Sequence, residues 1–253
     1  MIRIISDVHG AVNALRRVAA GDTPLLVLGD LINFIDYRDN TGIVTDVAGS
    51  DFVAEVVRLS SVGDYTSAGE LWRAHSRGRE QELRNLYAVA IAAAYTEICA
   101  PLEGVEAYVT YGNVDNPVVM DEHLPASATM IEAGIIELDG QTIGIVGGGV
   151  PTINSPGEIS DEEMAKRLDG IGSVDVLCTH VAPAVRPLAA DVIGGRAKGS
   201  PAVRDYIEQY QPSRHYFGDI HQPQAVTWRI GDTVCTNVGY FRATGRVFEH
   251  HAG

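Results

Sequence analysis

Eight aspartate, asparagine and histidine residues lie in five short motifs, each beside a glycine or at the end of an apolar run. The motifs are Asp7-Val8-His9-Gly10, Gly29-Asp30, Gly112-Asn113-Val114-Asp115, Thr179-His180 and Gly218-Asp219-Ile220-His221. Carboxylate, amide and imidazole groups are ligands for divalent metals. A single motif of this kind is common by chance. The order of the five motifs, and the apolar run before each, together predict one dinuclear metal site.

An apolar run precedes each of these motifs. The runs cover residues 2–5, 25–28, 107–110, 174–178 and 216–217. Short apolar runs that are rich in β-forming residues and bounded by glycine or polar residues are typical of buried strands. The carboxyl ends of neighbouring parallel strands open on one crevice, where open α/β sheets bind ligands. The motifs are therefore expected to converge there, and their glycines let the backbone pass close to the metals.

Single motifs also have simpler structural interpretations. Asp7 and Asp30 could cap helices that follow their strands, because aspartate is common at that position. His180 on its own would be a hydrogen-bonded histidine of the core or of a loop. These alternatives stay open for each residue alone, whereas the agreement of all five motifs favours metal binding.

The motifs resemble those of the calcineurin-like metallophosphoesterase superfamily, whose pattern is D-x-H, G-D, G-N-H-(D/E), H and G-H-x-H. The resemblance runs from Met1 to about Asn237, with a long insertion between the second and third motifs. It implies an α/β (α+β) fold, a sandwich of two mixed β-sheets flanked by helices. It also implies a single domain over residues 1–253 that contains a helical insertion at about 36–104.

The resemblance further implies a ligand set and a reaction. By position, the first metal would be held by Asp7, His9, Asp30 and His221. The second metal would be held by Asp30, Asn113, His180 and Asp219. In the family, a hydroxide that bridges the two metals attacks phosphorus in line with the leaving group.

Two positions depart from the family pattern. Val114 stands in place of the G-N-H histidine, which contacts phosphate and assists the leaving group, and valine can do neither. Asp219 replaces the first histidine of G-H-x-H, and its hard oxygen donor shifts the expected pair of divalent ions toward Mn²⁺ or Fe, with Mg²⁺ or Zn²⁺ as alternatives. Asp115 is the candidate catalytic residue, because it could orient Asn113 or a water beside the metals.

The predicted function is a metal-dependent phosphoesterase. General-acid help is worth ~10²–10⁴-fold, so its loss at position 114 favours phosphodiesters with acidic leaving groups over monoesters. His75 or His123 could return the lost histidine, although a helix-face or solvent histidine is the simpler interpretation of both. The alternative function is an interaction scaffold with weakened catalysis, which the changes at positions 114 and 219 favour and the six retained ligand-type residues disfavour.

Composition narrows the range of partners. A hydrophobic share of 45% and a charged share of 21% are those of a globular protein. The net charge of -14, with no basic stripe, disfavours extended nucleic acid but leaves a small phosphate ester as substrate. No uninterrupted apolar stretch approaches the ~20 residues of a membrane span, so no membrane partner is expected. The unpatterned Cys99, Cys178 and Cys235, and a strand in place of a signal peptide, predict a cytoplasmic protein.

The remaining elements follow from caps and turns. Helices are expected at 51–59, 67–99, 161–168 and 201–210, a hairpin at 135–138 and 141–146, and strands at 225–230, 233–237 and 245–250. The three glycines at 147–149 are expected to let the backbone pass beside the crevice. The helical insertion could cover a sheet edge, gate the site, or form a homo-oligomer through its alanine-rich part.

Overall fold

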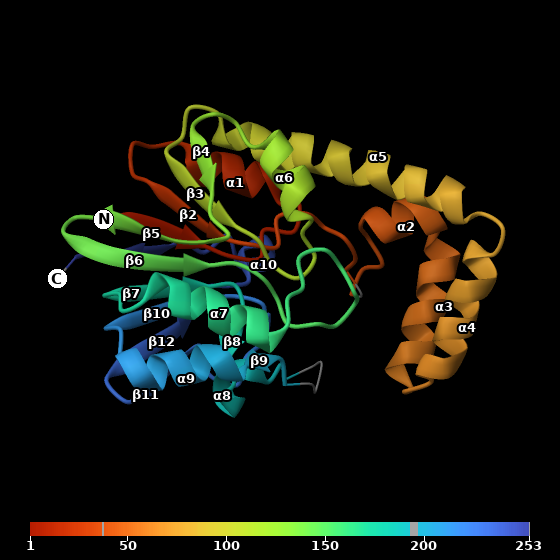
Figure 1. Cartoon of the computed structure of the whole chain (residues 1–253). Helices are drawn as coiled ribbons and strands as arrows, with labels where there is room; N and C mark the ends of the chain where they lie inside the picture. The colour runs from red at the N-terminus through yellow and green to blue at the C-terminus, as the bar shows by residue number, and fades with distance from the viewer. Residues whose placement is uncertain (37, 193–196, 253) are drawn as a thin grey trace.

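Two β-sheets form the centre of the molecule in the computed structural model, which describes residues 1–36, 38–192 and 197–252 (Figure 1). The first sheet has the order β13-β1-β2-β3-β4, with bounds Phe248–His250, Ile2–Ile5, Leu25–Leu28, Ala107–Thr110 and Ala128–Met130. The second has the order β11-β12-β10-β7-β6-β5, with bounds Thr227–Ile230, Thr233–Asn237, Arg214–Phe217, Val176–Thr179, Gln141–Val146 and Ala133–Leu138. A short third sheet pairs β8 (Ala182–Pro183) with β9 (Gly199–Ser200).

Both large sheets are mixed. In the first, β1 to β4 run parallel and β13 pairs antiparallel with β1. In the second, β6, β7, β10 and β12 run parallel, with antiparallel β5 and β11 at the two edges. The predicted sandwich of two mixed sheets flanked by helices is confirmed.

Helices cover the outer face of each sheet (Figure 1). The first sheet packs on α1 (Val12–Ala19), α5 (Glu80–Cys99) and α6 (Pro117–His123). The second packs on α7 (Asp161–Ile171) and α9 (Pro201–Tyr210). Between the sheets lies a third apolar cluster that includes Ile4, Leu28, Ile145 and Cys178. Strands buried on both faces explain why the sequence shows continuous apolar runs rather than alternation.

The helical segment between β2 and β3 extends away from the sheets. It contains α2 (Ile43–Ala48), α3 (Ser50–Ser61), α4 (Tyr65–Ser76) and α5, with α3 and α4 side by side at the far end of α5 (Figure 1). The helix expected at 51–59 is confirmed as α3. The helix expected over 67–99 is two helices, because the chain turns at Gly78, whose φ of +74° favours glycine.

One feature of α5 differs from the sequence expectation. With the 3₁₀ turn that follows it, residues 80–102 are long and apolar enough to cross a membrane by length and composition, with a mean hydropathy of 1.2. Of this window, 22% is buried, and the buried residues include Tyr95, Ile98 and Cys99 in the cluster under the first sheet. A single such helix is weak evidence, so the absence of a membrane partner stays a prediction.

The other expected elements are found close to their predicted places. The hairpin pairs Leu138 with Gln141, and the side chains of Ser160 and Ser200 cap α7 and α9 as the sequence indicates. The last strand, expected over 245–250, is found only over Phe248–His250 as β13. Before it lies a short helix, α10 (Phe241–Thr244), which ends at left-handed Gly245. A four-residue helix, α8 (Arg186–Ala189), follows β8.

Candidate metal centre

The ligand-type residues lie at the carboxyl ends of β1, β2, β3, β7 and β10, as the apolar runs predict. Four of these residues have left-handed backbones: Asp7 (φ 60°), His9 (φ 41°), Asp30 (φ 53°) and Asp219 (φ 63°). Such conformations are uncommon outside glycine and are stored where surrounding structure enforces them, often at functional sites. The left-handed backbones therefore mark these loops as parts of one candidate functional site.

The motif glycines are needed because the loops pack against one another. A Cβ at Gly112 would overlap the carboxylate of Asp30 and the imidazole of His180. A Cβ at Gly149 would overlap Asn113, which confirms the expected close passage of the 147–149 segment. Only glycine fits such contacts.

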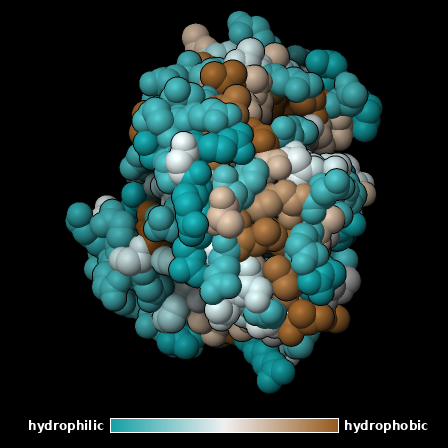
Figure 2. Space-filling view, turned by 90° about the vertical axis from the view of Figure 1, so that its right-hand side faces the viewer, coloured by the Kyte–Doolittle hydropathy of each residue, from teal (hydrophilic) through white to brown (hydrophobic). Residues whose placement is uncertain are grey.

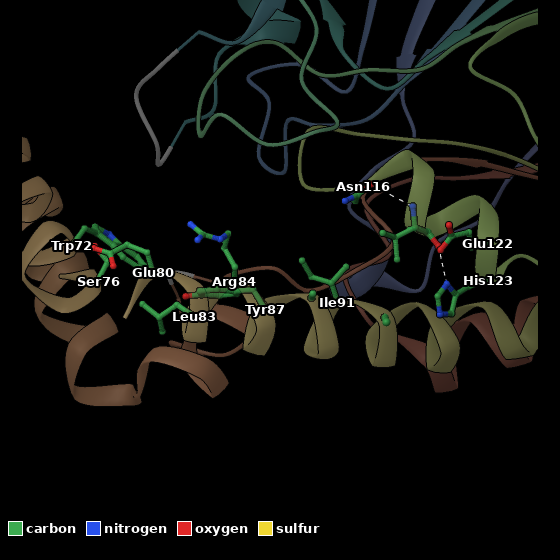
Figure 3. Close-up of a pocket in the computed structure, with 13 residues that line it drawn as sticks. Trp72, Ser76, Glu80, Leu83, Arg84, Tyr87, Ile91, Asn116, Glu122 and His123 are labelled. Atoms are coloured by element: carbon green, nitrogen blue, oxygen red, sulfur yellow. Dashed lines mark hydrogen bonds between the residues drawn. The ribbon is translucent and has the colours of Figure 1, made fainter. Parts of the chain in front are cut away.

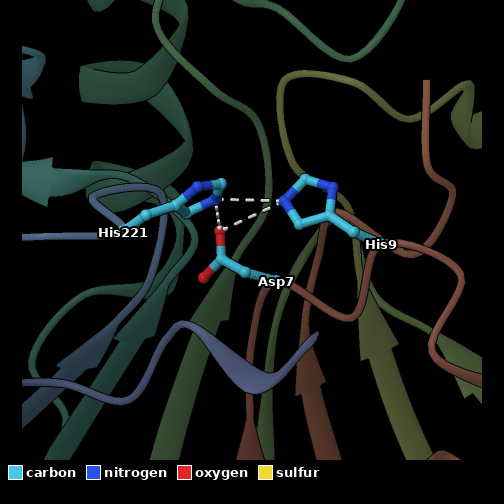
Figure 4. A group of neighbouring side chains, drawn as sticks. All are labelled: Asp7, His9 and His221. Atoms are coloured by element: carbon cyan, nitrogen blue, oxygen red, sulfur yellow. Dashed lines mark hydrogen bonds and ion pairs between the residues drawn. The ribbon is translucent and has the colours of Figure 1, made fainter. Parts of the chain in front are cut away.

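One group of side chains joins β1 to the loop after β10 (Figure 4). The Nε2 atoms of His9 and His221 are 3.1 Å apart, and Oδ1 of Asp7 lies 3.4 Å from His221 Nε2 and 3.9 Å from His9 Nε2. One donor atom from each of the three residues lies within 4.8 Å of the others. This group could hold a metal ion.

Asp30 connects that group to a second one. Its Oδ2 lies 3.6 Å from His9 Nε2, and its Oδ1 lies 3.5 Å from His180 Nε2. Asp7, Asp30 and His180 form the second group of donors within 4.8 Å, and Asn113 Oδ1 lies 3.4 Å from His180 Nε2. The two oxygens of one buried carboxylate therefore face two histidines from opposite groups.

Asp219 lies at the margin of this cluster. Its backbone N–H donates to both carboxylate oxygens of Asp7 at 3.2 Å, and its Oδ1 is 3.8 Å from the Lys198 ammonium. Its Oδ2 is buried without a hydrogen-bond partner among the described residues. A buried carboxylate oxygen with no partner fits a missing cation, because buried charges are paired or bind metals.

Backbone carbonyls orient two of the three histidines. The Nδ1–H of His180 donates to Leu28 O at 2.7 Å, which directs Nε2 toward Asp30 and Asn113. His9 makes a hydrogen bond with the backbone of Ile32. A metal-binding histidine commonly donates its other N–H in this way, which fixes the tautomer.

The electrostatics of the cluster show several charges confined together. Burial, with the negative charges of Asp115, Asp7 and Asp219, raises the pKa of Asp30 to about 7. Burial disfavours the charged form of His180, but Asp30, Asp7 and Asp219 outweigh it and raise its pKa to about 9. A divalent cation would relieve the repulsion between these carboxylates. The residues present therefore fit a metal.

Comparisons with known proteins agree with the fold. No protein-family model matches the chain, and no curated protein matches it. The match to one solved structure extends over 97% of this chain and 92% of the chain in that structure, with a TM-score of 0.57 and 17% identity. The structure of TT1561 of Thermus thermophilus covers 98% of this chain and 96% of its own, with a TM-score of 0.52 and 12% identity. Likeness at these identities shows the fold alone.

A third similar structure is that of a novel archaeal phosphodiesterase. It covers 96% of this chain and 86% of its own, at 12% identity and a TM-score of 0.39. A TM-score this low carries no argument about the present chain. The case for chemistry therefore depends on the side chains described above.

Asp115 has a different part from the one expected. Its buried carboxylate accepts hydrogen bonds from the backbone N–H groups of Asp30 (2.7 Å), Leu31 (3.0 Å) and Gly112 (3.0 Å), and from the Tyr95 hydroxyl (3.1 Å). These donors occupy both carboxylate oxygens. Asp115 therefore holds the two loops on which Asp30 and Asn113 lie, and these hydrogen bonds do not involve the side chain of Asn113. Asp115 thus positions these loops, and a catalytic part for it stays a prediction.

The structure brings neither candidate replacement for the missing histidine to the cluster. His75 packs on Phe52 within the α3–α4 pair, with ring centroids 4.2 Å apart. The Nδ1 of His123 bonds to Val119 O at 2.8 Å on α6. Val114 contributes only its backbone N–H, which donates to Asp30 Oδ1 at 3.1 Å. The function of the lost imidazole is therefore either absent or supplied by another residue.

Three residues near the cluster were missed by the sequence analysis. The Tyr240 ring stacks on His221 at 4.0 Å, Arg38 lies over that ring at 4.6 Å, and Lys198 pairs with Asp219. Arg38 and Tyr240 line a cavity of about 110 Å³ together with His9, Asn33 and His221. Nothing in the sequence marks them, because each stands outside the five motifs in a segment without periodic pattern.

A larger groove lies apart from the donor groups. Its volume is about 620 Å³, and Figure 3 shows Trp72 and Glu80 at one end and Glu122 and His123 of α6 at the other, with α5 between them. None of the residues in the two donor groups found in the described part of the chain lines it. The face of the molecule in Figure 2 is mainly hydrophilic, with hydrophobic residues gathered near its middle.

Proposed function

We propose that this chain is a metal-dependent phosphoesterase that hydrolyses a phosphodiester. The observation that carries the proposal is the Asp30 carboxylate, whose oxygens lie 3.6 Å and 3.5 Å from His9 and His180 in two adjoining donor groups. A carboxylate placed in this way is suited to bridge two divalent ions. Asp7, His9 and His221 would complete the first site.

The second site is proposed to use Asn113, His180 and Asp219 beside Asp30. The oxygen-rich donor set supports Mn²⁺ or Fe over Zn²⁺. When bound, two such metals supply Lewis acidity toward phosphate oxygens and a hydroxide nucleophile at neutral pH. The protein's own contribution is to fix the donors: Asp115 holds the loops of Asp30 and Gly112, and Leu28 O fixes the tautomer of His180.

The proposed substrate class follows from the leaving group. Val114 cannot protonate a departing alkoxide, His75 packs on Phe52 of α3, and His123 bonds to Val119 O of its own helix. When no general acid is present, the rate falls least for substrates whose leaving groups are acidic, because these leave without being protonated. Small aryl or similarly activated phosphodiesters are therefore the expected substrates, with monoesters slower. The free, buried state of Cys99, Cys178 and Cys235 supports a reducing compartment such as the cytoplasm.

The test combines metal analysis with a chromogenic aryl phosphodiester. We expect the purified chain to bind up to two Mn²⁺ ions per molecule and to hydrolyse the diester, with activity lost on chelation and restored by Mn²⁺. Faster hydrolysis of an alkyl phosphomonoester than of the aryl diester would contradict the substrate class. Metal binding without hydrolysis of any phosphate ester would instead favour the interaction scaffold.

A further inference from the structure

Arg38 reaches the donor cluster from the start of the helical segment. Its Nη2 lies 3.2 Å from Nδ1 of His221, and its guanidinium lies 4.6 Å over the Tyr240 ring. Its Nε is 3.6 Å from Asp36 Oδ1, and 48% of its side chain is exposed. Its other N–H groups have no side-chain partner among the described residues, and they border the 110 Å³ cavity beside His9.

The contact between Arg38 and His221 is incompatible with metal binding through the same imidazole. A guanidinium only donates hydrogen bonds, so a hydrogen bond from Arg38 requires Nδ1 of His221 to carry no proton. The Nε2 atom, however, is the one that faces His9 and Asp7. Metal binding at Nε2 moves the proton to Nδ1 and ends the hydrogen bond, which leaves Arg38 with free donors beside the metal.

Among the described residues, the other cations near the cluster are held by partners or lie outside the cavity. Arg242 donates to His9 O at 2.8 Å and lies 3.7 Å from Asp36, so it holds the loops together. The Lys198 ammonium lies beside Asp219 and is not among the residues that line the cavity. Arg38 is therefore the cation whose bonding capacity is open toward the cavity, and a planar guanidinium suits two oxygens of one phosphate.

We propose that Arg38 binds a phosphate oxygen of the substrate in the cavity beside His9 and His221, and so supplies the phosphate contact that Val114 cannot make. The cavity of about 110 Å³ exceeds the ~30 Å³ of one water molecule several-fold, so it has room for a small anionic group. The identity of that group as a substrate phosphate rests on the proposed function. The anion site itself rests on the geometry of Arg38.

The test measures binding of inorganic phosphate to the full-length Mn²⁺-loaded protein by calorimetry. Arg38→Gln should weaken phosphate binding by at least about tenfold, the value of one charge-assisted hydrogen bond, and Arg38→Lys should weaken it less. Arg58→Gln is the matched control, because Arg58 is an exposed arginine paired with Glu55 on α3. Phosphate affinity of Arg38→Gln within twofold of wild type would overturn the proposal.

A second readout examines the metal without phosphate. Glutamine can accept a hydrogen bond from Nδ1–H of His221, so Arg38→Gln should bind Mn²⁺ as tightly as wild type or more tightly. Weaker Mn²⁺ binding would overturn the proposal, because Arg38 would then support the metal rather than an anion.

The two proposals can fail separately. If the wild-type chain hydrolyses no phosphate ester while its phosphate affinity still depends on Arg38, the phosphoesterase function is wrong and the anion site stands. If the wild-type chain hydrolyses diesters and Arg38→Gln leaves both KM and phosphate affinity unchanged, the anion site is wrong and the function stands.

Discussion

The two halves of the candidate metal centre differ in how completely their donors are assembled. In the half formed by Asp7, His9 and His221, donor atoms lie 3.1–3.9 Å apart, and the nearby cation Arg38 is half-exposed. In the other half, His180 and Asn113 lie together, but Asp219 is absent from the donor groups found among the described residues and has an ammonium beside it.

This difference indicates that the two metals would bind with unequal strength. The first half offers two imidazoles and a carboxylate that already converge. The second must draw Asp219 away from Lys198 before its ligand set is complete, and that separation costs binding free energy. We expect one tight site and one weaker site, joined through Asp30.

Asp30→Asn should have the largest effect, because one Asp30 oxygen faces His9 of the first half and the other faces His180 of the second. An amide has one oxygen acceptor in place of a bridging carboxylate, so both metals should be lost together and diester hydrolysis should fall by more than ~100-fold, beyond the 10–100-fold typical of changes to residues that merely support a ligand. Metal content and turnover measured on the same sample check this prediction. Asp169→Asn, at an exposed position on α7, is the matched control.

Thermal unfolding separates that loss from misfolding. In the metal-free protein, Asp30 is buried among Asp7, Asp115 and Asp219, whose charges help to raise its pKa to about 7. Removing one of these charges should leave the metal-free melting temperature unchanged or raise it. An active Asp30→Asn protein with two metals would show that Asp30 does not bridge.

The parts of the centre that could be predicted from sequence are those fixed by strand ends. Asp7, Asp30, Asn113 and His180 follow buried strands, and the parallel order of those strands brings them to one edge whatever the rest of the chain does. Apolar runs and caps likewise predicted individual strands and the capped helices α7 and α9, whereas the sandwich of two sheets was implied by the family resemblance. Apolar runs and caps are local signals, so local reasoning finds them.

The parts that could not be predicted depend on long-range packing. Arg38 and Lys198 lie in loops, and their positions beside His221 and Asp219 follow from tertiary contacts that no periodic pattern records. The contacts of Asp115 have the same origin, because its partners include Tyr95, 20 residues earlier on α5. The glycine at position 78 breaks the long helix, a turn signal that was overlooked within a strongly helical composition.

Changes at Asp219 should affect the second half alone. Asp219→Ala should weaken the second metal by about 10–100-fold while the first stays bound, because Asp7, His9 and His221 are untouched. Asp219→His restores an imidazole and should raise turnover or shift preference toward Zn²⁺. Stepwise Mn²⁺ titration followed by diester kinetics distinguishes the two variants. Two tightly bound metals and full activity in Asp219→Ala would remove Asp219 from the ligand set.

The smallest expected effect concerns Lys198, whose ammonium lies 3.8 Å from Asp219 with 37% of the side chain exposed. Partly exposed ion pairs are worth about 0.2–1 kcal/mol, so Lys198→Met should tighten the second Mn²⁺ by only ~1.5–5-fold. Lys166→Met is the matched control, since Lys166 lies 3.7 Å from Glu163 on the exposed face of α7. Weaker second-site binding in Lys198→Met would mean that Lys198 positions Asp219 for the metal.

A double-mutant cycle decides whether the pair causes the inequality between the two halves. In the Asp219→His background there is no carboxylate for Lys198 to occupy, so Lys198→Met should no longer improve metal binding through that contact. If the lysine change tightens the second metal equally in both backgrounds, its effect is general repulsion of cations. Only a gain confined to the Asp219 protein traces the weaker half to the Lys198–Asp219 pair.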